Sequence, residues 1–283
     1  MLLKRALFAT APALALVFAA AAVAATAPSP AAPGAKPSAT APAKPATPPK
    51  PVKATPAQRA EADRLEPLGQ AAFWAREVDV DQTDVEARLK LAKALRVLGR
   101  YEEAGENADQ LLVIQPTNYE ALLESARDRI AQNQGFYAID PAQRAEALQP
   151  RDWRPVSLLA IGMEQSERES EALAAHQKAL ALAPNNPATL SNLGMYYATH
   201  GDRTQAEALL RRAVAAPGAG AQERQNLALV LGMAGHIDEA EQLARQDLPP
   251  QTVSNNLAYL HAAVDPAPAP GGEHSWSRVK SAQ

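Results

Sequence analysis

The chain has 283 residues, of which 47% are hydrophobic and only 5% aromatic, and it contains no cysteine. Without cysteine, disulfide scaffolds, thiolate zinc sites, cysteine nucleophiles and lipidation on cysteine are excluded. The net charge of −3 argues against general nucleic-acid binding, because neutralising phosphate groups requires a basic surface.

The amino terminus has the organisation of a secretory signal peptide. Lys4 and Arg5 precede an uncharged run over residues 6–25 that ends in small residues. We therefore expect residues 1–25 to direct export to the periplasm or the cell envelope. The run is also long enough to span a bilayer, so an uncleaved membrane anchor is the alternative. Membrane contact is expected only through this segment.

A proline-rich segment follows the leader. Residues 26–56 contain ten prolines and four lysines with no acidic residue. Such a composition builds no packed core and favours extended polyproline conformations, so we interpret the segment as a disordered spacer. A weak contact of its lysines with anionic envelope polymers is the alternative. We expect one domain over residues 57–264, followed by a disordered tail over residues 265–283.

A repeat with a period of 34 residues runs through this domain. One column of small residues consists of Ala104, Ala138, Ala172, Ala206 and Ala240. A second column, twelve residues earlier in each unit, consists of Ala92, Ala126, Ala160, Gly194 and Ala228. A third column consists of Pro116, Pro150 and Pro184. This period and pattern are typical of the tetratricopeptide repeat, in which two antiparallel helices cross at small residues and proline marks the turn to the next pair.

The repeat predicts an all-α tetratricopeptide superhelix of about five helix pairs with flanking capping helices. The five units are residues 85–118, 119–152, 153–186, 187–220 and 221–254. An amphipathic helical stretch over residues 59–77, which carries Phe73 and Trp74, is expected to cover the first unit. Residues 255–264 are a truncated copy of a unit, and we expect them to form a single capping helix equivalent to a first helix.

The second unit is irregular, because Pro141 falls where its second helix should already be running. Asp140 fits an N-cap and Pro141 the first helical position, so we expect this helix to start late and to be short. Residues 133–137 would then form a loop bearing Phe136 and Tyr137. The two rings either pack beneath this loop or form a hot spot for a partner protein.

The first helices of such an array line its concave face, and the residue two before the second column points into that face. In the C-terminal half, this position holds Asn192, Asn226 and Asn256. A side-chain amide pairs with both C=O and N–H groups, so these residues are candidates for holding every third residue of an extended peptide. Alternatively, the amides solvate the groove or bond neighbouring helices. The N-terminal half carries four cations that would favour acidic side chains further along the ligand, namely Lys90, Lys93, Arg96 and Arg127.

No motif for cofactor or metal chemistry stands out. The chain has no GxxxxGK[ST] loop, and its five histidines never pair at the spacings of metal ligands. We interpret the histidines as turn and surface residues. Asp79, Asp81 and Asp84 lack the glycine and glutamate of a calcium loop, and Asp84 is expected to cap the next helix. The sequence therefore predicts no cofactor, no metal site and no catalytic residues.

Several segments carry a resemblance to a known family. They are residues 135–141, 150–155, 209–214, 224–232 and 240–259. Over residues 59–262 the chain resembles the TadD family, the tetratricopeptide proteins of the tight-adherence (Flp) pilus assembly system. The resemblance implies a non-enzymatic envelope accessory that binds protein segments of the pilus machine or its secretin. Many members are lipoproteins, whereas this chain has no cysteine. The alternative is an adaptor for another envelope complex, such as cell-wall or cytochrome maturation machinery.

Overall fold

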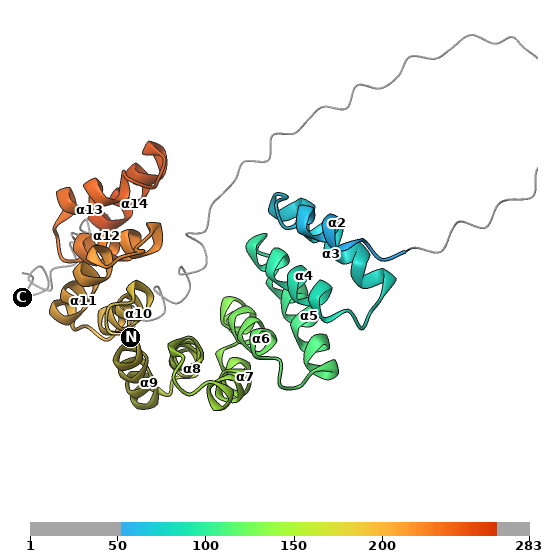
Figure 1. The fold of residues 1–283 in the computed structure, drawn as a ribbon. Coiled ribbons are helices and arrows are strands. Elements are labelled where there is room, and N and C mark those ends of the chain that lie inside the picture. Colours follow the sequence, from blue (N-terminus) through green and yellow to red (C-terminus); the bar gives the residue numbers. More distant parts are fainter. Residues whose placement is uncertain (1–51, 265–283) are drawn as a thin grey trace, which may run out of the picture.

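The described part of the chain is entirely helical. The computed structural model describes residues 52–264, which form thirteen α-helices and no strand (Figure 1). The expected signal peptide, most of the proline-rich segment and the expected tail lie outside these residues. Within the described range, no helix is both long and apolar enough to cross a membrane.

The helices are arranged as consecutive pairs. The leading pair is α2 (Pro56–Ala62) with α3 (Pro67–Val80). Five further pairs are α4 (Val85–Val97) with α5 (Tyr101–Ile114), α6 (Tyr119–Ala131) with α7 (Gly135–Leu148), α8 (Trp153–Gln165) with α9 (Glu169–Leu182), α10 (Pro187–Thr199) with α11 (Arg203–Ala215), and α12 (Ala221–Met233) with α13 (Ile237–Ala244). The last described helix is α14 (Pro250–Val264). The five first helices begin at the first residues of the five units assigned from the sequence.

The pairs stack into an open arc. Figure 1 shows the first helices α4, α6, α8, α10 and α12, together with α14, along the inner side, and the second helices along the outer side. Each helix packs against the other member of its pair, and successive first helices also contact one another. The fold class predicted from the 34-residue period, an all-α solenoid of helix pairs, is confirmed.

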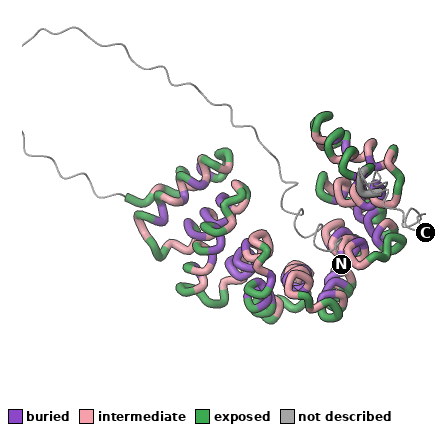
Figure 2. The backbone as a smooth tube through the Cα atoms, turned by 180° about the vertical axis from the view of Figure 1, so that it is seen from behind, coloured by how far each residue is buried: buried purple, intermediate pink, exposed green. Residues whose placement is uncertain are grey.

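Small residues allow the two helices of a pair to approach closely. Ala160 of α8 and Ala172 of α9 are both fully buried. In the pair α10 and α11, Gly194 takes the place of Ala160, and a Cβ added there would lie only 2.9 Å from Leu210 Cγ. Because interiors are packed this densely, larger side chains are not accommodated at the crossing. Figure 2 shows the buried residues on the sides of the helices that face one another.

A side-chain N-cap that recurs every 34 residues fixes the start of four first helices. These caps are Asp84, Asn118, Asp152 and Asn186, whose side chains accept backbone N–H groups of the following turn. They satisfy donors that a helix start leaves without an intrahelical partner. The predicted cap at Asp84 is confirmed, because its Oδ1 accepts the Ala87 N–H at 3.0 Å. In the fifth unit Gly220 has no side chain to offer, and its own N–H donates to Glu223 at 2.8 Å.

The second unit, formed by α6 and α7, departs from the sequence prediction. α7 has 14 residues and runs through Pro141, so the expected late, short helix and the loop over residues 133–137 are wrong. Asp140 is not an N-cap but lies inside the helix, 3.2 Å from Arg144. Proline costs a helix interior one hydrogen bond, here the one to the Tyr137 carbonyl. Packing of α7 against α6 and α8 offsets that cost, since tertiary contacts supply most helix stability.

The N-terminal flank forms two helices rather than one amphipathic stretch. A turn over residues 63–66 separates α2 from α3. Trp74 of α3 is fully buried and packs with the core residues of α2 and α4. Glu77, also fully buried, lies 2.7 Å from Arg59 of α2 and ties the two helices together.

The C-terminal end of the array is compressed. α13 has only 8 residues, whereas α5, α7, α9 and α11 have 13 or 14. α14 begins at Pro250, five residues before the capping helix expected over residues 255–264. This short second helix explains why Asn256 follows Asn226 after 30 residues instead of 34.

Within each pair the chain reverses through a left-handed residue at the same position of the repeat. Gly99, Gly201 and Gly235 have φ of 75°, 88° and 88°. At the equivalent positions Asn133 and Glu167 have φ of 58° and 60°. Glycine adopts this conformation without a Cβ clash, whereas other residues lose about 1–2 kcal/mol.

Candidate functional site

The inner side of the arc holds most of the residues singled out from the sequence. Lys90, Glu124, Leu158, Asn192 and Asn226 occupy the same position on successive first helices, and Asn256 takes that position on α14. Because these helices contact their neighbours in turn, the six side chains follow one another along the arc. Ion pairs and hydrogen bonds between first helices connect this row, and its two halves differ in chemistry.

Ion pairs cross-link the N-terminal half. Lys90 lies 2.6 Å from Asp63, at the end of α2, and Lys93 lies 3.2 Å from Glu120 of α6. Arg154 of α8 is 3.5 Å from the other oxygen of Glu120. These contacts form a ladder from α2 to α8. Since each cation already faces a carboxylate, an acidic ligand binds here only by competing with those carboxylates.

Two buried carboxyl groups lie on α6 in this half. Glu124 is only 1% exposed, and both Arg96 Nε and Arg127 Nη1 bind it at 2.7 Å. Asp128, one turn later, is fully buried, and neither of its carboxyl oxygens has a hydrogen-bond partner. Burial, followed by the nearby charge of Glu124, raises the pKa of Asp128 to about 8, while Arg96 and Arg127 oppose this. At neutral pH the Asp128 carboxyl is therefore mostly protonated.

Amide side chains cross-link the C-terminal half. Asn192 Nδ2 donates to Ser157 Oγ at 2.9 Å, and Asn226 Nδ2 donates to Ser191 Oγ at 2.9 Å. Asn226 Oδ1 also accepts from Gln222 at 3.0 Å. These amides thus bond the preceding first helix, which is one of the alternatives considered from the sequence. Asn192 keeps its oxygen and its second N–H for other contacts.

An apolar column runs beside the amides. It consists of Ile161, Met195, Leu229 and Tyr259. Ile161 lies three residues after Leu158, and the other three lie three residues after the asparagines of the same row, here called the amide row. Residues three apart share one face of a helix. The first three are half-buried and Tyr259 is 58% exposed. Sequence reasoning missed this column, although its spacing of 34, 34 and 30 residues was a signal. The C-terminal half of the inner face is thus uncharged and partly apolar.

Phe136 and Tyr137 lie in the first turn of α7, on the outer side of the arc. They are 70% and 64% exposed, and their rings meet edge to face with centroids 5.5 Å apart. The interpretation that these rings pack beneath a loop is therefore wrong.

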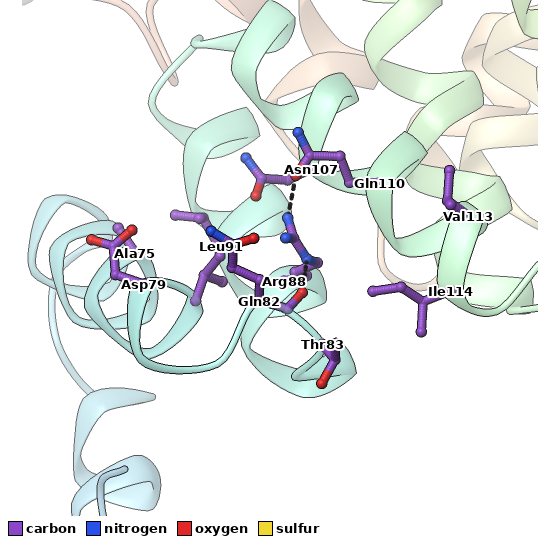
Figure 3. Close-up of a pocket in the computed structure, with 11 residues that line it drawn as sticks. Ala75, Asp79, Gln82, Thr83, Arg88, Leu91, Asn107, Gln110, Val113 and Ile114 are labelled. Atoms are coloured by element: carbon purple, nitrogen blue, oxygen red, sulfur yellow. Dashed lines mark hydrogen bonds between the residues drawn. The ribbon is translucent and has the colours of Figure 1, made fainter. Parts of the chain in front are cut away.

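A cleft of about 700 Å³, not anticipated from the sequence, lies between α3, α4 and α5 (Figure 3). Arg88 donates to Gln110, as the dashed line in Figure 3 shows. Among the described residues, Asp79 and Arg88 are the only charged ones that line this cleft. The lining therefore lacks the paired carboxylates that general acid and base catalysis would use.

One histidine departs from the expected turn and surface role. His176 of α9 is 2% exposed, with Nε2 3.4 Å from Glu164 and its ring 5.5 Å from that of Tyr196. This histidine belongs to the core between the third and fourth pairs. Over residues 52–264, no group of three or more His, Cys, Asp or Glu side chains is placed to hold a metal ion.

Comparison with solved structures identifies the architecture. A tetratricopeptide-repeat protein from Thermus thermophilus matches with a TM-score of 0.57 and 24% identity, over 62% of this chain and 98% of its own. A tetratricopeptide repeat protein from Parabacteroides merdae matches with a TM-score of 0.63 and 14% identity, over 73% of this chain and 86% of its own. The fold is a tetratricopeptide-repeat solenoid. Solenoids of stacked repeats present an extended concave surface. No family model and no curated protein matches the sequence.

Proposed function

We propose that this protein is a non-enzymatic scaffold of the periplasm or cell envelope that assists assembly of the Flp (tight-adherence) pilus machinery. The resemblance to the TadD family and the signal-type sequence of residues 1–25 support this role. The solenoid fold supports a protein-binding mode of action. In this proposal, a segment of a pilus or secretin component lies along the inner face.

The observation that carries the binding mode is the chemistry of the C-terminal half of that face. Side-chain amides at Asn192, Asn226 and Asn256 follow one another along the arc, and the apolar column runs parallel to them. Adjacent helices pack about 8–10 Å apart, and three residues of extended chain span about the same distance. Successive amides along the arc thus reach every third residue of an extended segment. The column of Ile161, Met195 and Leu229 covers its apolar side chains.

The binding mode is tested by replacing Asn192, Asn226 and Asn256 together with alanine. We expect the affinity for the partner segment to fall by roughly 10 to 10³-fold, since each lost hydrogen-bonded amide costs about 0.5–1.5 kcal/mol. Full affinity in this variant would refute the amide-based mode.

A matched control separates binding from the internal bonds of the same amides. Replacing Ser157 and Ser191 with alanine removes the hydrogen bonds that Asn192 and Asn226 make to the preceding helices, but it leaves the amides in place. We expect this variant to keep its affinity. Equal loss of affinity in both variants would mean that the amides act only by holding the helices together.

The cellular role is tested by affinity capture from detergent-solubilised envelopes, followed by mass spectrometry. We expect wild-type protein to retain pilus-assembly or secretin components and the triple asparagine variant to lose them. Recovery of cell-wall or cytochrome maturation proteins in their place would refute the pilus role and support an adaptor of another envelope complex.

A further inference from the structure

A second candidate surface lies on the opposite side of the solenoid from the amide row. A pocket of about 430 Å³ lies between α5 and α7, over α6. Leu112, Ile139 and Pro141 contribute its apolar lining, together with the rings of Phe136 and Tyr137. Since both rings are mostly exposed, the pocket presents an aromatic edge at its mouth.

The other units show that the fold does not require these rings. The equivalent residue pairs are Glu102-Glu103, Ser170-Glu171, Thr204-Gln205 and Asp238-Glu239. Each also lies at the start of a second helix, where acidic residues complement the helix dipole. Among these units, only the second has two exposed aromatic residues at this place, where the others have polar or acidic ones. Large exposed aromatic side chains of this kind are enriched at protein interfaces.

The turn that carries the rings packs tightly against α8. Gly135 precedes Phe136, and a Cβ at Gly135 would lie 2.4 Å from Gln165 Cβ and 2.7 Å from the Gly162 carbonyl oxygen. The start of α7 is thus pressed against the end of α8. Because the backbone under the rings is fixed, binding at this edge loses little conformational entropy.

The pocket is also unusual in its charge. Residues 57–264 carry 20 Lys and Arg against 29 Asp and Glu, so their net charge is 20 − 29 = −9. The pocket lining instead has an excess of one positive charge. Its charged residues are Arg129, Arg144, Arg168, Asp109 and Asp140. All three arginines are in ion pairs with side chains that are themselves partly exposed, so a ligand carboxylate can compete for them.

We propose that this pocket binds a partner-protein segment in which an aromatic or branched apolar side chain lies close in sequence to acidic residues. The apolar side chain lies against Phe136, Tyr137 and Leu112. The carboxylates bind the arginine side chains. The site is separate from the amide row, so the solenoid holds two protein segments at once, one on each face.

The test is a selection of phage-displayed random dodecapeptides on the immobilised full chain. We expect enriched peptides to share an aromatic or branched apolar residue with Asp or Glu within three positions of it. A synthetic copy of an enriched peptide should bind the variant Phe136→Ser/Tyr137→Glu at least about 10-fold more weakly than wild type. This variant copies Ser170-Glu171 of the next unit, so it should retain the wild-type thermal transition.

Two further variants sharpen the test. Arg144→Gln should weaken binding of the acidic peptide and reduce its dependence on salt, while leaving a peptide with neutral amides in place of the acids unaffected. Thr204→Ser/Gln205→Glu makes the matched change in the fourth unit and should leave binding unchanged. Enriched peptides that bind wild type and Phe136→Ser/Tyr137→Glu equally would overturn the proposal. So would a selection that yields no consensus, or one that yields basic, proline-rich peptides resembling residues 26–51 of this chain.

Discussion

Asp128 is a carboxyl group in a place that the other repeats fill with uncharged residues. The equivalent buried positions are Ala94, Gly162, Tyr196 and Val230. Replacing Asp128 with alanine therefore copies the first unit. The substitution removes a fully buried group whose two oxygens have no hydrogen-bond partner. We expect the substitution to stabilise the protein at neutral pH and to leave its stability nearly unchanged near pH 4.

The sign and size follow from proton linkage. The pKa of Asp128 is about 8 in the folded chain, against an ordinary value of 3.8. Between those pH values the unfolded chain has released the proton and the folded chain still holds it, so folding becomes less favourable as pH rises. The slope is about 1.4 kcal/mol per pH unit, or about 4 kcal/mol from pH 4 to pH 7. The contribution of Asp128 to the free energy of unfolding is fully present below pH 4 and is lost as the pH rises to 8.

The assay is urea unfolding followed by circular dichroism at several pH values between 4 and 9. We expect Asp128→Ala to match wild type near pH 4, within the small cost of lost packing, and to exceed it by about 2–4 kcal/mol at pH 7. Asp140→Ala, at a largely exposed carboxylate on α7, is the control and should keep the wild-type pH dependence. An Asp128→Ala variant with the wild-type slope, or one less stable than wild type at pH 7, would refute the reasoning.

Three further outcomes are expected. Ala172→Leu overpacks the fully buried crossing of α8 and α9, should cost about 1–3 kcal/mol in chemical unfolding and should uncouple the two halves of the array; an unchanged melting curve would show that the repeat register is wrong. Glu167→Gly relieves a left-handed backbone at φ 60° and should stabilise by about 1 kcal/mol, measured by thermal unfolding, whereas a lower transition would contradict the strain argument. The chain isolated from cells should begin after Ala25 and fractionate as soluble periplasmic protein, and a membrane-bound chain starting at Met1 would establish the anchored form instead.

The repeat architecture was predictable because one interaction recurs at a fixed spacing. Ala160 and Ala172 belong to two columns of small residues that recur in every unit, and such a recurrence is rare by chance. The N-caps at Asp84 and its equivalents follow the same spacing and carry the same information about helix starts. Local rules failed where packing overrode them. Pro141 indicated a helix start by its own preference, but the contacts of α7 with its neighbours hold a helix through it.

The candidate site was predictable only by position on the repeat. The row of Asn192, Asn226 and Asn256 was visible from spacing, whereas the bond from Asn192 to Ser157 joins residues 35 apart and depends on how far one unit rotates against the next. The burial of Asp128 was equally hidden. An acidic residue near other charges is expected at the surface from sequence alone, and only the packing against α5 reveals it as a core residue.

The two kinds of cross-link along the inner face, ion pairs and hydrogen bonds between neutral side chains, differ in their sensitivity to salt. Coulombic links such as Lys93 to Glu120 weaken as salt is added, because charges near water are screened over about 8 Å at physiological ionic strength. Links between neutral groups, such as Asn226 to Ser191, do not. Raising the ionic strength therefore weakens the inner-face links of the N-terminal half more than those of the C-terminal half. We therefore expect the curvature of the N-terminal half to depend on salt concentration more than that of the C-terminal half.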